Sequence, residues 1–312
     1  MVDMRVSIGS LTLSNPVMPG SGTFGEGMCR VIDLNRLGAI VTKTITGDLR
    51  EGNVPPRVAE LRGATLFSIG IPSKGPTHYI EELVPLYGQY SPPLIASISA
   101  NTIEEFGELA ARISVPGVTA IEANVSCPNL KKDGQAFGMD PQATEDVIRT
   151  MKAATNLQVW AKLSPNVGNI AAMARAAENG GADALVCANA MLAMAIDVET
   201  FKPKVGNLMG GITGDATKPI ILRMAYQCAQ AVSIPIIGCG GISTTEDALE
   251  YMLAGCTAVQ VGTASFVSPN AMLKVIDGLQ AFCRRRGIAR VADLVGAMQM
   301  HEPRMLERSA AL

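Results

Sequence analysis

A cysteine stands between two asparagines in the stretch NVSCPNL, residues 124–130. A free thiol has a pKa of about 8.5, close enough to neutrality for Cys127 to take or give a proton when its neighbours assist. The amides of Asn124 and Asn129 can read a planar ring that carries C=O and N–H groups. A lone cysteine is more often a small buried hydrophobe, so the role of this thiol depends on its place in the fold.

Two lysines, Lys43 and Lys162, each end an apolar run that is typical of a buried strand. An ammonium group at such a position needs an anionic or polar partner, or else reaches water along its aliphatic stem. Two lysines that face one end of a fold favour an anionic ligand or a reduced flavin, whose N1 region carries negative charge.

Small residues end two further apolar runs, in IIGCGGIST and VQVGTAS. Backbone N–H groups at such a turn, together with the start of the following helix, can cradle a phosphate. The alternative is that Gly240, Gly241 and Gly262 only permit tight turns. Since both motifs occur, and in the last two candidate strands, we expect a phosphate site.

The elements that must position these residues alternate along the chain. We expect strands at 17–20, 39–43, 94–99, 119–126, 158–164, 182–189, 234–241 and 258–264, and helices at 102–113, 141–154, 168–179, 216–232, 244–254 and 269–285. This alternation predicts an α/β fold, a (β/α)8 barrel, with a doubly wound sheet as the alternative. Chemistry in a barrel lies at the carboxyl ends of the strands, where the thiol, the lysines and the glycines fall.

Length and composition limit the remaining choices. The chain has 312 residues, of which 48% are hydrophobic, and a formal net charge of −2. We expect one domain over 1–312, with residues 44–92 as an elaborated loop after the second strand. Seven cysteines without a C-x-x-C pair argue against a disulfide framework, a zinc site or an iron–sulfur cluster held by this chain alone. We expect no nucleic-acid or membrane partner, no metal and a cytoplasmic location.

Several ordered motifs carry a resemblance to a known family: NPVMPGSGTFG, GAIVTKTIT, REGNVPPR, NVSCPN, DGQAFGMDP, AKLSPNV, MAIDVET, IPIIGCGGIS and VQVGTA. Over residues 5–295 the chain resembles dihydroorotate dehydrogenase, above all its cytosolic, NAD-linked class. The resemblance implies an FMN-bearing catalytic subunit that oxidises dihydroorotate to orotate in pyrimidine biosynthesis. It also implies a homodimer, or a heterotetramer with a second subunit that carries FAD and an iron–sulfur cluster.

The resemblance assigns roles by position. Cys127 corresponds to the base that takes the proton from C5 of dihydroorotate while hydride passes from C6 to flavin N5, with Lys43 beside flavin and substrate. The residues implied in cofactor binding are Ser21, Gly22, Lys43, Thr44, Ser97, Asn124, Lys162, Gly214, Gly240, Gly241, Gly262 and Thr263. The residues implied at the substrate are Lys43, Phe67, Gly70, Asn124, Asn129, Asn189 and Ala190.

The chain departs from the family pattern where the substrate is expected. The usual LNxxGLxNxG reads LFSIGIPSKG at 66–75, so Phe67 and Ser73 replace asparagines. The usual INT is ANA, which removes a hydroxyl at Ala190, and Ser97 replaces an asparagine, as it does in the fumarate-using class. Either dihydroorotate is gripped differently here, or the chain is a paralogue for another cyclic amide or activated C=C compound. A non-redox barrel that binds a phosphorylated substrate is a third alternative.

Overall fold

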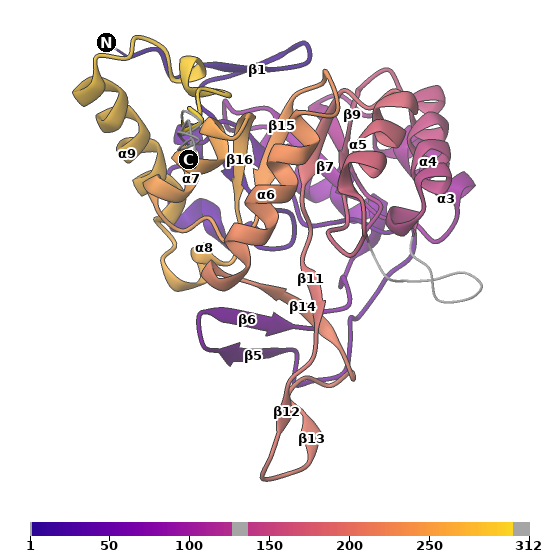
Figure 1. The fold of residues 1–312 in the computed structure, drawn as a ribbon. Coiled ribbons are helices and arrows are strands. Elements are labelled where there is room, and N and C mark those ends of the chain that lie inside the picture. Colours follow the sequence, from indigo (N-terminus) through magenta and orange to yellow (C-terminus); the bar gives the residue numbers. More distant parts are fainter. Residues whose placement is uncertain (1, 127–136, 302–312) are drawn as a thin grey trace, which may run out of the picture.

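Eight parallel strands form a nearly closed barrel in the computed structural model, which describes residues 2–126 and 137–301 (Figure 1). In chain order they are β3 (Val17–Pro19), β4 (Ile40–Val41), β7 (Leu94–Ile98), β8 (Val118–Asn124), β9 (Gln158–Lys162), β10 (Ala184–Cys187), β15 (Ile236–Cys239) and β16 (Cys256–Val261). The sheet begins with β3 and ends with β4, and the Gly38 N–H donates to the Val17 carbonyl at 2.8 Å where these two meet. The predicted (β/α)8 barrel is confirmed.

Helices connect the strands and cover the outside of the barrel (Figure 1). They are α3 (Ile103–Ile113), α4 (Pro141–Ala154), α5 (Ile170–Asn179), α6 (Lys218–Ala229), α7 (Thr245–Leu253), α8 (Ala264–Val267) and α9 (Ala271–Arg286). Side chains accept hydrogen bonds at the starts of four of them, at Thr102, Asp140, Asn169 and Thr244. These caps satisfy N–H groups that a helix cannot pair internally, so local sequence fixes where each helix begins.

The strands are apolar on both sides because they face the barrel interior on one side and helices on the other. Every residue of β7 and of β9 is buried. The amino end of the barrel is covered by a hairpin of β1 (Val6–Ile8) and β2 (Leu11–Leu13), whose Ser10 hydroxyl accepts from Gln158 at 2.7 Å. The opposite, carboxyl end is therefore the one left for a site.

A small antiparallel sheet extends from the carboxyl end of the barrel (Figure 1). Its order is β11 (Met191–Ala193), β14 (Gly210–Thr213), β6 (Ala64–Phe67) and β5 (Val58–Leu61). Beyond it projects a two-stranded hairpin of β12 (Ile196–Asp197) and β13 (Lys202–Pro203). Residues 75–87 form α1 (Gly75–His78), a π-helical turn (Tyr79–Leu83) and α2 (Val84–Tyr87).

Membrane-spanning structure is not found in the helices of the described residues, since none is long and apolar enough to cross a bilayer.

Candidate active site

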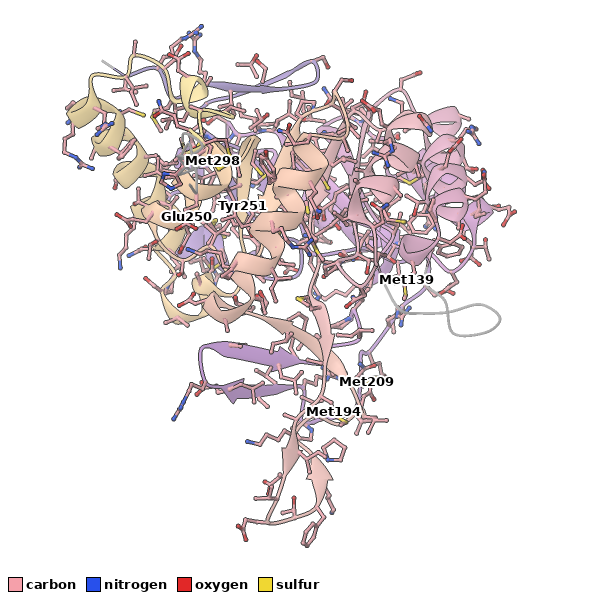
Figure 2. The ribbon with its side chains drawn as sticks, viewed as in Figure 1. Met139, Met194, Met209, Glu250, Tyr251 and Met298 are labelled. Carbon is pink, nitrogen blue, oxygen red and sulfur yellow. The ribbon has the colours of Figure 1, made fainter. Side chains whose placement is uncertain are left out.

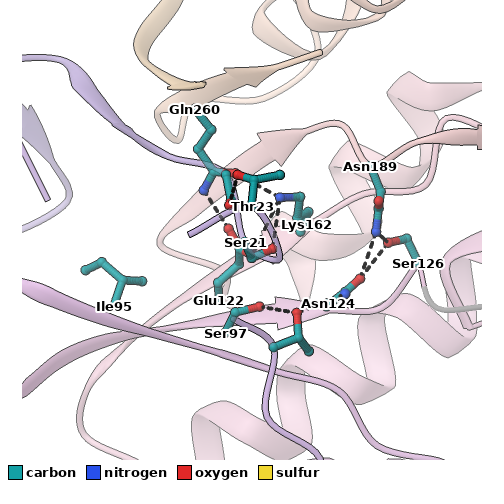
Figure 3. Close-up of polar contacts among 12 residues, drawn as sticks. Ser21, Thr23, Ile95, Ser97, Glu122, Asn124, Ser126, Lys162, Asn189 and Gln260 are labelled. Atoms are coloured by element: carbon teal, nitrogen blue, oxygen red, sulfur yellow. Dashed lines mark hydrogen bonds and ion pairs between the residues drawn. The ribbon is translucent and has the colours of Figure 1, made fainter. Parts of the chain in front are cut away.

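Lys162 forms the centre of a buried polar group at the carboxyl end of β9 (Figure 3). Its ammonium donates to the Gln260 side-chain oxygen at 2.8 Å and to the Ser21 hydroxyl at 3.1 Å, and it lies 3.7 Å from a carboxylate oxygen of Glu122. Only 3% of Lys162 is exposed, so the lysine does not reach bulk water. It lies among fixed partners, and the expectation that a lysine here needs a polar or anionic partner is met by the protein itself.

The charge of Lys162 is maintained despite this burial. Burial acts to lower the pKa of Lys162, but neighbouring negative groups at Cys239 and Glu122 outweigh it and raise the pKa above its usual value. Burial raises the pKa of the Cys239 thiol, which keeps that group neutral near pH 7, so we assign the effect to the Glu122 carboxylate. The Lys162 ammonium is therefore positively charged near pH 7, and Gln260 and Glu122 contact it from the barrel interior.

Lys43 is the contrasting lysine, directly after β4. It is half-buried, and burial lowers its pKa. With the residues that the structure describes it forms neither a hydrogen bond nor an ion pair. It lines a cavity of about 370 Å³ together with Thr44 and the rings of Phe24, Tyr79 and Tyr87. A desolvated ammonium without a counter-ion is costly, so this position favours an anionic or strongly polar ligand.

Amides and hydroxyls from four strand ends form a connected network, which Figure 3 shows together with Lys162. The hydroxyls of Ser97 and Thr44 are 3.0 Å apart, and the Asn124 amide donates to Thr44 at 3.4 Å. The Asn189 amide donates to the Asn124 carbonyl oxygen at 3.1 Å and also to the Ser126 hydroxyl. The network places both predicted amides, Asn124 and Asn189, where a planar ligand with C=O and N–H groups could compete for them.

Glycines shape the edge where the phosphate is predicted. A Cβ atom on Gly241 would lie 2.6 Å from the Gly214 carbonyl oxygen and 2.7 Å from the Lys218 Cβ, so this glycine is required by the protein's own packing. A Cβ on Gly22 would meet nothing within 4 Å, and one on Gly262 only a methyl group at 3.7 Å. Gly241 and Gly214 therefore hold the backbone turn together, while Gly22 and Gly262 border open space that a ligand can fill.

The start of α7 is occupied by the protein's own carboxylate. Asp247 accepts from the backbone N–H groups of Ser243 and Thr244 and from the Lys218 ammonium at 2.6 Å. Burial would raise the pKa of Asp247, but these hydrogen bonds lower it to about 2. Since α7 is capped by the protein's own side chains, the phosphate site expected from the sequence is confined to the backbone at 240–241 and 262–263.

A buried hydroxyl without a partner lies next to that backbone. Ser265 Oγ has no hydrogen-bond partner among the described residues, two positions after the predicted Thr263. The Ser265 backbone N–H donates to the Gly262 carbonyl at 3.0 Å, so the hydroxyl lies in the same turn. Because this hydroxyl is covered by the protein itself, it is a local unsatisfied group and does not by itself mark a ligand contact.

Two of the departures from the family pattern, Phe67 and Ala190, lie against the same glycine, Gly211. Phe67 in β6 pairs with Gly211 in β14. A Cβ built on Gly211 would lie 2.8 Å from the Ala190 Cβ and 3.0 Å from the Phe67 ring. The aromatic ring, the glycine and the alanine thus form one apolar contact. Ser73 has a local role, since its hydroxyl accepts from the backbone N–H groups of Thr46 at 3.1 Å and Gly75 at 3.2 Å.

The remaining predicted residues have different outcomes. Cys127 and Asn129 lie outside the described residues; the described chain stops just before them at Ser126, inside the amide network. Gly70 has a φ of +80° and its Cα faces Asn53, so it belongs to a backbone turn that follows β6. Gly240 has a φ of +149° and its carbonyl accepts from the Tyr251 hydroxyl at 2.8 Å.

Sequence reasoning missed Glu122, Gln260, Ser126 and Asn166. The first two are single polar residues inside apolar strands, in AIEAN and AVQVG, and that mismatch is the signal that could have found them. Asn166 holds the segment after β10, because its amide donates to the Ala190 carbonyl at 3.3 Å and its oxygen accepts from the Leu192 N–H at 2.8 Å.

Comparison with known proteins gives concordant matches over nearly the whole chain. The family model described as dihydroorotate dehydrogenase matches residues 3–283. The chain is 47% identical over 302 residues to a protein of Desulforamulus reducens named dihydroorotate dehydrogenase B (NAD(+)), catalytic subunit, covering 96% of this chain and 99% of that one. Proteins of the same name from Trichlorobacter lovleyi and Thermoanaerobacter pseudethanolicus are 46% and 44% identical, over 95% and 96% of this chain and 98% and 100% of theirs.

Proposed function

This chain belongs to the dihydroorotate dehydrogenase family and is an oxidoreductase acting on CH–CH groups, and we propose that it oxidises dihydroorotate to orotate with bound FMN. Family membership removes the non-redox barrel from the alternatives. The observation that carries the proposal is the pair of lysines at the barrel mouth: one is charged and fully held by the protein, and the other is half-buried and lacks a counter-ion in the described chain.

The residues present fit FMN. Gly22 and Gly262 border open space, and the backbone at 240–241 and 262–263 offers donors for a phosphate. Lys162 offers a fixed positive charge for the flavin ring system, and the Ser21 hydroxyl accepts a hydrogen bond from the Lys162 ammonium. When bound, FMN supplies the acceptor for the hydride that leaves C6 of dihydroorotate.

The chain's own residues supply binding and proton chemistry. Lys43 provides the counter-charge for the substrate carboxylate, and Asn124 and Asn189 orient the ring through their amides. Cys127 takes the C5 proton as a thiolate, which completes a two-electron oxidation of the C5–C6 bond together with the hydride loss at C6. In the sequence Cys127 follows Asn124 by three positions and Ser126 by one, and we propose it as the base on this basis and on the family resemblance.

A second candidate substrate is favoured by the apolar contact of Phe67, Gly211 and Ala190. Where the family pattern has an amide and a hydroxyl, this chain presents a ring and a methyl group, neither of which donates a hydrogen bond. A flavin dehydrogenase or reductase for a less polar cyclic amide or activated C=C compound would suit this surface. Orotate added to the flavin-loaded protein separates the two, because a bound planar ligand perturbs the flavin absorption band.

Electron transfer to NAD requires a partner in this proposal. The relatives are named as catalytic subunits of an NAD(+) enzyme. In the described ranges no group of three or more histidine, cysteine or acidic residues could hold a metal ion. We therefore propose a second subunit with FAD and an iron–sulfur cluster. The isolated chain should reduce artificial acceptors and leave NAD unreduced; rapid NAD reduction by the chain alone would contradict the proposal.

A homodimer is the second association we propose, through the segment 192–209. This segment projects from the barrel, and large apolar side chains are exposed along it: Leu192, Met194, Ile196, Val198, Phe201, Leu208 and Met209. Figure 2 labels two of them, Met194 and Met209. Exposed apolar clusters of this kind mark interaction surfaces. Its charges balance, with Asp197 and Glu199 against Lys202 and Lys204, so two copies can meet without repulsion. Phe201→Asp should convert a dimer to a monomer in analytical ultracentrifugation.

A further inference from the structure

Glu122 is a fully buried carboxylate in the middle of a barrel strand. It lies in β8, with Ser97 of β7 and Trp160 of β9 as its register partners, and its exposure is 0%. One carboxylate oxygen accepts from the Gln260 amide at 2.6 Å. The other has no hydrogen-bond partner among the described residues and lies 3.7 Å from the Lys162 ammonium. An ionised group in such a place persists only when its charge is compensated.

Gln260 connects this carboxylate to the lysine. Its amide nitrogen donates to Glu122, and its carbonyl oxygen accepts from Lys162 at 2.8 Å. A carboxylate can only accept and an ammonium can only donate, so the two neighbours fix the orientation of the Gln260 amide. Three strands, β8, β16 and β9, are thereby joined through side chains in the interior of the barrel (Figure 3).

This arrangement limits where Lys162 can point. Two of its three N–H donors are taken by Gln260 and Ser21, and Glu122 attracts the ammonium from the barrel interior. The lysine is therefore held in one position before any ligand arrives, and its charge is partly offset by a carboxylate buried at the same depth.

We infer that Glu122 is a positioning residue for the flavin site: through Gln260 it fixes Lys162, and its negative charge lowers the reduction potential of bound FMN. The inference rests on the proposed function, because it requires FMN beside Lys162. Negative charge on FMN increases when it is reduced. Lys162 stabilises that added charge and Glu122 opposes it, so the carboxylate moderates the lysine's effect.

Glu122→Gln tests the charge while nearly preserving the shape. The variant should retain FMN, and the equilibrium constant for two-electron reduction of the flavin should rise about tenfold, a positive shift of about 30 mV. The matched control is Asp183→Asn, which removes a carboxylate that accepts a hydrogen bond from Lys152 at 2.8 Å. Asp183 lies at the amino end of β10, whereas the proposed flavin site lies at the carboxyl ends of the strands. The control should leave the potential unchanged.

The outcomes separate this inference from the proposed function. A folded, FMN-loaded Glu122→Gln with the potential of the unmutated protein would overturn the inference and leave FMN binding intact. An unmutated protein that takes up no FMN would overturn the proposed function, and the inference with it. If Glu122→Gln does not fold, Gln260→Met replaces it. That variant removes the 2.8 Å acceptor of Lys162 and should weaken FMN binding about tenfold, and unchanged affinity would also overturn the inference.

Discussion

Lys162 and Lys43 end two strands of one barrel, yet their surroundings are opposite in kind. Lys162 is held by Gln260, Ser21 and Glu122, and these partners compensate the desolvation of its charge in the absence of any ligand. Lys43 faces a cavity without a partner in the described chain, and burial lowers its pKa. The proposed cofactor side of the mouth is therefore preorganised, whereas the proposed substrate side lacks a counter-charge within the described residues. Substitutions on the two sides should differ in what they damage.

The largest effect is expected on the substrate side, at the proposed base. Cys127→Ala should slow flavin reduction by dihydroorotate by about 10²–10⁴-fold, because general base catalysis contributes that much, while FMN stays bound. Stopped-flow absorbance of the flavin measures it. The control is Cys29→Ala, which changes a half-buried cysteine in the 3-10 helix Glu26–Arg30 and should leave the flavin reduction rate normal. Normal reduction in Cys127→Ala would remove the thiol from the mechanism.

On the cofactor side, the expected damage is to folding and flavin retention. Lys162→Met leaves Glu122 buried without its cation, which should cost about 3–5 kcal/mol of unfolding free energy and release FMN. Lys152→Met breaks a partly exposed pair with Asp183 and should cost about 1 kcal/mol or less. Urea denaturation and flavin absorbance report both. Full flavin occupancy in Lys162→Met would contradict the proposed role of Lys162 in holding FMN, and with it the contrast between Lys162 and Lys43.

Lys43→Met should weaken orotate binding by about 10–100-fold. It should leave stability unchanged, because Lys43 forms no hydrogen bond or ion pair with the described residues, and FMN content nearly unchanged, because the phosphate and Lys162 contacts remain. Burial lowers the pKa of Lys43, so the ammonium is charged below that pKa and neutral above it. Orotate affinity of the unmutated protein should accordingly fall as pH rises through a value below the ordinary 10.5. Lys74→Met, on the rim of the same cavity, is the matched control. Equal affinity in both variants would contradict the role of Lys43.

The smallest effect is expected from Phe67→Asn, which tests the substrate side through the Michaelis constant for dihydroorotate. It restores a donor in the apolar contact with Gly211 and Ala190, and should lower the Michaelis constant for dihydroorotate about tenfold. Phe67→Leu keeps the contact apolar and should not. If Phe67→Asn instead creates dihydroorotate activity that the unmutated protein lacks, the native substrate is a different compound.

Much of the preorganised side could be predicted from sequence, because polar and small residues at strand ends stand out against apolar runs. Ser21, Lys162 and the glycine tails were identified on that basis. Glu122 and Gln260 were missed, since a single polar residue within a strand has no periodicity. The contact of Phe67 with Gly211 joins segments far apart in the chain, which pattern reasoning cannot pair. The strands at 191–213 are too short to show an alternation.

Titration of the purified, FMN-loaded protein with orotate tests the central claim most directly. The account places a flavin on the preorganised side and an anionic planar ligand against Lys43 on the other. It predicts a yellow protein whose flavin band near ~450 nm shifts with saturation at sub-millimolar orotate, since hydrogen bonds to charged groups contribute about 1.5–3 kcal/mol each. A fully loaded protein whose spectrum does not change at ~10 mM orotate, where even a ligand of Kd about 1 mM would saturate it, would contradict dihydroorotate as the substrate.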